Sequence, residues 1–265
     1  MATVKEIYEF INSIAPFDIQ ESFDNAGFLV GRKDREVRKI LVALDITGEV
    51  AEEAARLGAE LIVAHHPVIF NPVKSITDET LTGQVLLALA EQKIAAICAH
   101  TNLDAACGGV NDCLAEALEL TEIIRLQQAG VDAQGRPYGI GRVGTVHRPG
   151  LSPAEYAAFV KEKLGSSSVR FVDGGRPVQR VAVGGGACGS MLEDAVAQGC
   201  DTFVTADLKY NQFLDAKALG LNLLDAGHFS TENVVCAPMA RWLSEEFPMV
   251  EVRLSEVHRE VYRTV

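Results

Sequence analysis

Apolar and polar residues alternate along this chain with two periods, one typical of helices and the other typical of buried strands. A helix to about Ile14 opens with a capping box formed by Thr3 and Glu6. Short apolar runs and amphipathic stretches then follow one another, which predicts strands at 40–44, 62–63 and 94–99 and helices at 47–57 and 81–92. This strand-helix-strand order predicts an α/β fold with a mostly parallel sheet and right-handed crossovers.

The second half of the chain repeats this alternation after a break between residues 127 and 135, where glycine and glutamine interrupt the pattern. We expect further strands at 142–146, 169–172, 181–183, 203–205 and 221–224, a helix capped by Ser152, and helices at 191–198 and 210–218. The domain prediction is a first α/β lobe over 1–127, closed by a loop and helix at 108–120, and a second lobe over 128–235. A last helix and strand, within 236–265, would return to the first lobe.

The pair His65-His66 stands at the end of the apolar run 61–64 and is followed by Pro67. Successive side chains on a strand point to opposite faces, so adjacent imidazoles can serve one site only where the chain turns. Pro67 favours such a turn because its ring fixes its own φ and disfavours a helical His66. The pair indicates a metal site, although one packed and one solvent-facing histidine would give the same pattern.

Three further polar residues follow the ends of other apolar runs. Asp104 comes just past the run 94–99, and His228 with Glu232 comes past the run 221–224. The carboxyl ends of parallel strands share one edge of a sheet, which is where open α/β folds collect their sites. The spacing of His228 and Glu232 also places both side chains on one face of a helix. With the histidine pair, these residues are candidates for a single metal site.

Composition narrows the class of protein. The 265 residues are 48% hydrophobic and 23% charged, which is ordinary for a globular chain that buries its own core. The six cysteines form no C-x-x-C pair and are scattered through apolar stretches, which favours reduced thiols and a cytoplasmic location. The first residues show no basic segment leading into an apolar one, and no apolar run reaches membrane-spanning length. We therefore expect neither secretion nor membrane insertion.

The net charge of the chain indicates which kinds of macromolecule it can bind. The net charge is −12, from 24 basic and 36 acidic residues. Binding a phosphate backbone needs a basic face, so this balance argues against nucleic acid as a partner and leaves room only for a local basic patch.

Four groups of motifs run in order along nearly the whole chain: Phe23-Asp24-Asn25-Ala26-Gly27 with Val30-Gly31; His65-His66-Pro67; His100-Thr101-Asn102-Leu103-Asp104 with Gly108-Gly109-Val110-Asn111; and Gly227-His228-Phe229-Ser230-Thr231-Glu232. With these motifs the sequence resembles the Nif-three-like family, also catalogued as DUF thirty-four, whose bacterial members are often labelled GTP cyclohydrolase I type 2 homologues. One segment departs from the family pattern, from Thr205 to Asn211, where relatives commonly show a Gly before the acidic residue and a His near Asn211.

The resemblance implies two α/β lobes with a two-metal site in the cleft between them. The implied ligands are His65, His66, Asp104, His228 and Glu232. Imidazole and carboxylate donors without thiolate suit Zn, Mn, Fe, Co or Ni, and a carboxylate can bridge two ions about 3.5 to 4 Å apart. Such a pair lowers the pKa of water, and five ligands over two ions leave open positions, as in catalytic sites. The resemblance also implies a ring-like homohexamer, a trimer of dimers.

Two further residues are candidates for catalysis. His100 lies at a strand end, four residues before Asp104, where it could orient a ligand, act as a general base, or simply be packed. Asp24 precedes the expected strand at 28–30, and its motif can be read either as a catalytic carboxylate or as turn chemistry.

A glycine-rich segment offers a competing interpretation. Residues Gly184 to Gly189 satisfy G-x-G-x-x-G between a strand and a helix, and Asp207 ends the next strand at about the 20-residue distance expected for a dinucleotide site. The segment stands late in the chain, however, and too few βαβ units follow it to complete such a fold. Its N–H groups could instead meet an anion such as a substrate phosphate, or the glycines could allow a tight turn with close packing.

Three classes of function remain. The first is a metal-dependent hydrolase that acts on a nucleotide or another phosphorylated metabolite. The second is a metal-binding interaction or scaffold protein, whose ligand chemistry would be the same. The third is a dinucleotide-dependent oxidoreductase, which would leave the histidines without a role.

Overall fold

The computed structural model describes residues 2–265, and the chain divides into two compact units. Unit 1 is the described part of Met1–Leu103 together with Cys236–Arg259, and unit 2 is Asp104–Val235 with Glu260–Val265. The first crossing between the units therefore falls between Leu103 and Asp104, whereas the sequence predicted a boundary near residues 127 to 135. The reason is that α5 (Val110–Ala117) and β7 (Leu120–Arg125) pack with strands of the second sheet.

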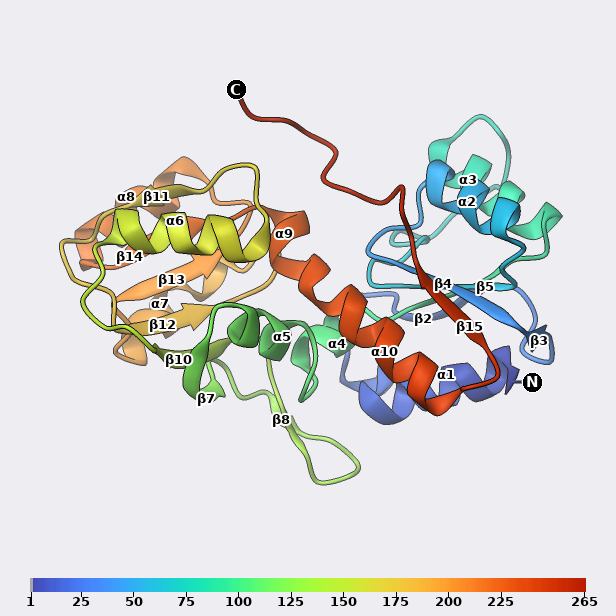
Figure 1. Ribbon diagram of the computed structural model, residues 1–265, viewed down its shortest axis with the longest axis horizontal. Coiled ribbons are helices and arrows are strands. Elements are labelled where there is room, and N and C mark those ends of the chain that lie inside the picture. Colours follow the sequence, from blue (N-terminus) through green and yellow to red (C-terminus); the bar gives the residue numbers. More distant parts are fainter. Residues whose placement is uncertain (1) are drawn as a thin grey trace. The chain divides into compact units, whose positions relative to one another are not determined.

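Unit 1 is built on a five-stranded sheet in the order β15-β4-β5-β6-β2. The strands are β15 (Glu251–Leu254), β4 (Lys39–Ala43), β5 (Leu61–Ala64), β6 (Ala95–Cys98) and β2 (Gly27–Val30). The first four run parallel, and β2 is antiparallel to β6. Figure 1 shows β15 beside β4, so an edge of this sheet is supplied by the far end of the chain.

Four helices accompany this sheet: α1 (Val4–Ile14), α2 (Gly48–Leu57), α3 (Leu81–Glu91) and α10 (Cys236–Glu246). The capping box of Thr3 and Glu6 opens α1, and the Thr47 side chain caps α2, as the sequence predicted. One face of the sheet shares a buried core with α2 and α3 that includes Leu41, Ile62, Ala96, Ala54 and Leu89. Smaller elements are β1 (Ala2–Thr3), which pairs with β3 (Glu36–Val37), and η1 (Phe17–Ile19).

Unit 2 is built on a six-stranded sheet in the order β11-β14-β13-β12-β10-β7. The strands are β11 (Arg170–Val172), β14 (Asn222–Asp225), β13 (Thr202–Thr205), β12 (Arg180–Val183), β10 (Arg142–Val146) and β7 (Leu120–Arg125). β12 pairs with β13 and β13 with β14 in parallel, whereas the pairs β11–β14, β12–β10 and β10–β7 are antiparallel. Strand β7 was not predicted, and its antiparallel pairing with β10 is what attaches residues 104–127 to this unit.

Helices cover both faces of the second sheet, as β12 illustrates. Val181 and Val183 belong to a buried core with α5 (Val110–Ala117) and α6 (Pro153–Leu164), and Ala182, between them, belongs to a core with α7 (Leu192–Ala197) and α8 (Tyr210–Leu219). In Figure 1, α6 lies across one face of this sheet. The remaining elements are α4 (Thr101–Ala105), α9 (His228–Glu232), η2 (Gly189–Met191), η3 (Asn233–Val235) and the hairpin β8 (Gly130–Val131) to β9 (Pro137–Tyr138).

None of the helices formed by residues 2–265 is both long and apolar enough to cross a membrane.

A buried arginine ties the start of α5 to β10. The Arg142 side chain donates to both carboxylate oxygens of Asp112, at 2.7 Å each, and to the carbonyls of Ala106, Gly139 and Gly141. Arg142 is 1% exposed, so its charge depends on these partners for compensation.

We expect Asp112→Ala to lower the free energy of unfolding by about 2 to 4 kcal/mol, because it leaves the Arg142 guanidinium buried without its counter-charge. Urea denaturation followed by circular dichroism measures this loss. The matched control is Glu9→Ala, which removes an exposed ion pair with Lys5 at 3.6 Å and should cost at most about 0.5 kcal/mol. Equal losses in the two variants would contradict a special role for the buried pair.

Candidate metal centre

Three imidazoles of unit 1 converge where two neighbouring strands end. β5 ends at Ala64 and is followed by His65 and His66, and β6 ends at Cys98, two residues before His100. Ala64 pairs with Cys98 in the parallel register, which brings the two strand ends level. One ring nitrogen of each histidine lies within 4.8 Å of those of the other two, so the turn expected at Pro67 does direct both members of the pair to one place.

The first two of these rings are held through Nδ1. His65 Nδ1 lies 2.8 Å from the carbonyl oxygen of Ala99 and donates to it, because a carbonyl can only accept. His66 Nδ1 lies 2.7 Å from a carboxylate oxygen of Asp45, which comes two residues after the end of β4. A proton on Nδ1 leaves the lone pair on Nε2, and this is how metal-binding histidines are usually oriented.

His100 is held in the same way by Asp24. Its Nδ1 lies 2.7 Å from one carboxylate oxygen of Asp24, and the other oxygen accepts from the hydroxyl and the backbone N–H of Thr101 at 2.5 and 3.0 Å. Burial raises the pKa of Asp24, but the hydrogen bonds from His100 and Thr101 outweigh burial and lower this pKa to about 2. Asp24 is therefore an enclosed anion that fixes the orientation of His100. Its role extends beyond the turn that its sequence motif suggests.

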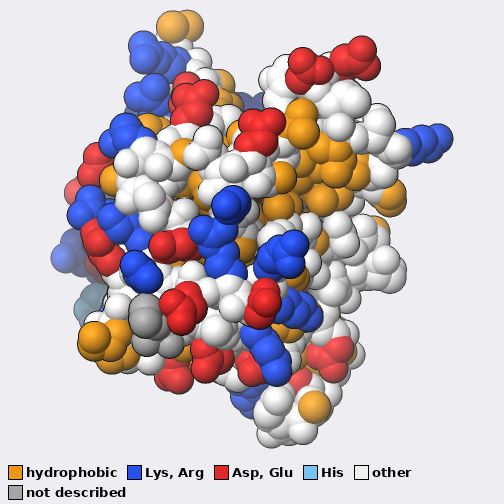
Figure 2. Space-filling model, turned by 90° about the vertical axis from the view of Figure 1, so that its right-hand side faces the viewer, with side chains coloured by type: hydrophobic (Ala, Val, Ile, Leu, Met, Phe, Trp, Pro, Cys, Tyr) orange, Lys and Arg blue, Asp and Glu red, His pale blue; other side chains and the backbone are white. Residues whose placement is uncertain are grey.

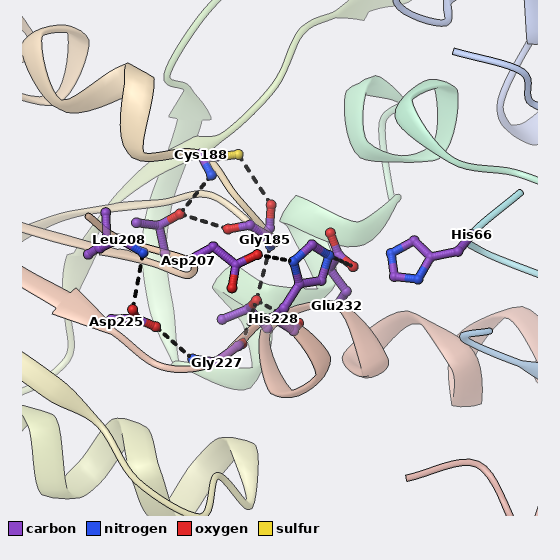
Figure 3. A network of polar contacts seen from close by, with 12 residues as sticks. His66, Gly185, Cys188, Asp207, Leu208, Asp225, Gly227, His228 and Glu232 are labelled. Atoms are coloured by element: carbon purple, nitrogen blue, oxygen red, sulfur yellow. Dashed lines mark hydrogen bonds and ion pairs between the residues drawn. The ribbon is translucent and has the colours of Figure 1, made fainter. Parts of the chain in front are cut away.

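Unit 2 carries a second cluster on α9. His228 is the first residue of this helix and Glu232 the last, and His228 Nε2 lies 3.0 Å from a carboxylate oxygen of Glu232. His228 Nδ1 lies 2.7 Å from Asp207, as Figure 3 shows. Asp207 has a φ of +53°, a left-handed conformation that costs a non-glycine residue about 1 kcal/mol. This strained aspartate belongs to the segment that departs from the family pattern, and here it orients His228.

Asp104 lies on α4 in the same unit. It is 7% exposed, and its backbone carbonyl accepts from the Asn111 side chain at 2.9 Å. Burial is the main cause that raises the pKa of the Cys188 thiol. The negative charges of Asp104 and then Glu232 raise this pKa further, which indicates that both carboxylates lie near the sulfur. Unit 2 thus gathers His228 and Glu232 with Asp104 nearby, and the donors are nitrogen and oxygen.

The glycine-rich segment packs against these candidate ligands. The N–H groups of Gly185 and Gly186 donate to the side chains of Asn111 and Thr231, at 2.9 and 3.0 Å, so they are already engaged within the protein. A Cβ added to Gly186 would stand 2.1 Å from a carboxylate oxygen of Glu232. This geometry favours the interpretation of close packing over the anion-binding and dinucleotide interpretations.

Two residues of these clusters were not predicted as partners of the histidines. Asp45 was not singled out as a partner of His66, and Asp207 was considered only for a dinucleotide site. The available signal was position, because each is an acidic residue two places past the end of a strand, β4 or β13. The other two histidines are not part of the clusters: His147 is exposed, and His258 lies near Ser255.

Known proteins and a family model resemble this chain along most of its length. The family model described as Duf34/NIF3 (NGG1p interacting factor 3) matches residues 2–260. The chain belongs to this family. Duf34/NIF3 membership confirms the resemblance seen in the motifs, and the α/β fold expected from it is confirmed as well.

Individual members of the Duf34/NIF3 family are similar over most of their length. A "GTP cyclohydrolase 1 type 2 homolog" of Clostridium perfringens is 37% identical over 230 residues, which is 86% of this chain and 86% of that protein. A protein of the same description from Streptomyces coelicolor is 37% identical over 249 residues, covering 92% and 87% of the two chains. A crystal structure of a Bacillus cereus protein related to NIF3 superposes with a TM-score of 0.93 at 26% identity, covering 100% and 99%.

We expect Gly186→Ala to weaken Zn²⁺ binding at least about tenfold, because the added methyl group would displace the Glu232 carboxylate. Calorimetric titration of the full-length protein with Zn²⁺ measures the affinity. Gly199→Ala is a matched control: Gly199 also has a positive φ, of +73°, but a Cβ there would meet nothing within 4 Å. Gly199→Ala should lose about 1 kcal/mol of stability through its positive φ, and Gly186→Ala should lose more because of the added clash. Equal Zn²⁺ affinities would contradict the contact with Glu232.

Proposed function

We propose that this protein binds two divalent metal ions and hydrolyses a nucleotide or another phosphorylated metabolite. The observation that carries the proposal is the shared orientation of three histidines. His65, His66 and His228 each have Nδ1 within 2.8 Å of an oxygen atom of the chain, which is the orientation that metal-binding histidines usually have.

The proposed ligands are His65 and His66 of unit 1 and Asp104, His228 and Glu232 of unit 2. That both sets serve the same pair of ions is part of the proposal. The chain itself supports it, because His100 and Asp104 stand only four residues apart, and α4 contains the last residues of unit 1 and the first of unit 2. The donor set suits Zn, Mn, Fe, Co or Ni.

Two bound ions would lower the pKa of water and withdraw charge from a phosphate or a ring carbon under attack. The chain's own groups would handle the proton. His100 keeps its Nδ1–H on Asp24, so Nε2 can accept a proton from a water molecule and return it to a leaving group. Asp24, with a pKa of about 2, stays ionised throughout and stabilises the protonated ring. His100 would thus be the general base, and Asp24 its positioning residue.

The names of the relatives support a nucleotide as the substrate, because several are described as GTP cyclohydrolase 1 type 2 homologs. The alternative is a metal-binding interaction or scaffold protein, which the same ligands would serve. A dinucleotide-dependent oxidoreductase finds less support, because the N–H groups of Gly185 and Gly186 are used internally. A homohexamer, implied by the family resemblance, and a cytoplasmic location, expected from the cysteine usage, remain proposals.

We expect about two divalent ions per chain in protein purified under metal-replete conditions. His65→Ala and Glu232→Ala should each lower this number, because each removes one donor. Inductively coupled plasma mass spectrometry of the purified variants measures the content, with His147→Ala as the control, since His147 is exposed and outside the clusters. Metal content near zero in the wild type, or unchanged content in both ligand variants, would refute the proposed site.

We expect His100→Gln to keep its metal content and lose about 10²- to 10⁴-fold in turnover, because the proton acceptor is gone while the ligands remain. Asp104→Ala should lose metal and turnover together. The assay is hydrolysis of GTP, other nucleotides and a generic phosphoester by the metal-loaded protein, and His147→Gln is the control. Full activity of His100→Gln would remove His100 from the mechanism, and a metal-loaded wild type without turnover on any substrate would favour the interaction protein.

A further inference from the structure

A pocket lies in unit 1 between the turn after β2 and the end of α3, apart from the histidine cluster. Its volume is about 320 Å³, and its lining residues are Val30, Gly31, Arg32, Arg35, Leu89, Ala90, Lys93 and Ile94. The lining thus combines an apolar wall with three basic side chains and contains no acidic residue. Pockets of this kind accommodate small ligands, and this volume is at the lower end of their usual range of roughly 300 to 1,000 Å³.

The three basic side chains form no ion pair with an acidic side chain of the protein. Among residues 2–265, no ion pair within 4.0 Å involves Arg32, Arg35 or Lys93. Figure 2 looks onto the side of unit 1 that carries β3, and several Lys and Arg side chains gather there with acidic ones among them.

The backbone that carries the two arginines is held in place. The Arg35 N–H donates to the Arg32 carbonyl at 3.4 Å, which closes a turn. The first N–H groups of α1, from Val4 and Lys5, donate at 2.9 Å to the carbonyls of Arg35 and Lys33. The turn therefore caps a helix, and the arginine side chains extend from a fixed frame, which lowers the entropic cost of binding.

Lys93 occupies a position that normally selects glycine. It follows the last turn of α3 with a φ of +56°, and α2, α6 and α8 end on left-handed glycines, Gly58, Gly165 and Gly220. A lysine in this conformation costs about 1 kcal/mol more than glycine. Glu119, in the same conformation after α5, has Lys163 as an ion partner, whereas the Lys93 ammonium has none and lines the pocket.

The pocket is distinct from the histidine cluster. β6 runs from Ala95, just after the pocket residues Lys93 and Ile94, to Cys98, just before His100. The antiparallel β2 runs back from Gly27 to Val30, next to the pocket. The two sites thus stand at opposite ends of the same pair of strands, about 13 Å apart for a strand of four residues.

We propose that this pocket binds the phosphate group of a small phosphorylated molecule, as a second ligand site separate from the metal centre. Two guanidinium groups and an ammonium match phosphate oxygens in charge and hydrogen-bonding geometry, and the apolar wall would accommodate the organic part. A polyanion such as RNA is disfavoured because the remaining surface of an acidic chain would repel it. The proposal does not depend on the proposed hydrolysis.

The test is calorimetric titration of the full-length, metal-loaded protein with phenyl phosphate, which presents one phosphate and one apolar ring. Arg35→Gln and Lys93→Gly should each weaken binding at this site by about tenfold. Lys93→Gly should at the same time raise the melting temperature by roughly 2 °C, because glycine relieves the left-handed strain. Loss of binding in a more stable protein cannot be a consequence of misfolding.

The controls separate this pocket from other sources of phosphate binding. Arg38→Gln removes the same charge from a nearby exposed residue, between β3 and β4 and outside the lining, and it should bind like the wild type. His66→Ala alters the metal centre and should leave this binding event intact. The proposal is overturned if the wild type shows no saturable binding, if Arg35→Gln and Lys93→Gly bind like the wild type, if only His66→Ala loses binding, or if a single-stranded oligonucleotide displaces phenyl phosphate from the pocket.

Discussion

The candidate centre depends on one interaction repeated four times, a hydrogen bond from imidazole Nδ1 to a fixed oxygen. The acceptor is the Ala99 carbonyl for His65 and a carboxylate for the other three histidines. Each bond selects the tautomer and the direction in which the Nε2 lone pair points, so the rings are prepared before any ligand arrives. The cost of this arrangement is a set of carboxylates held in enclosed or strained positions, such as Asp24 and Asp207.

Much of the fold and of the site could be predicted because strand ends are visible in the sequence. The apolar runs located β4, β5 and β6 to within a residue or two, and parallel strands deliver the residues that follow them to one edge. His65 and His66 could therefore be assigned to one site, whereas His100, which joins them in the structure, was expected to be a catalytic residue and not a ligand. The spacing of His228 and Glu232 was likewise sufficient, because a helix brings such residues together whatever surrounds it.

What could not be predicted depends on pairing between distant segments. β7 has exposed residues on both faces, Thr121 to Ile124, so it lacks the alternation that marks a half-buried strand. The boundary predicted from the sequence therefore lies later in the chain than the division between the two units. The partners of the histidines were hidden for a similar reason: Asp45 and His66 are 21 residues apart, and no local pattern links them. In the glycine-rich segment a local pattern was present but misleading. Its spacing fits a dinucleotide-binding motif, whereas in the structure its glycines make room for Glu232.

The discontinuity of unit 1 has a consequence for how the chain folds during synthesis. Most of unit 2, Asp104–Val235, is one continuous stretch, whereas the sheet of unit 1 lacks its edge strand β15 until the last residues have been made. Unit 2 can therefore complete its sheet before unit 1 does. Until β15 has been synthesised, the outer edge of β4 stays unpaired. A nascent chain that stalls before residue 251 would leave that edge of β4 unpaired, which favours pairing with strands of other chains.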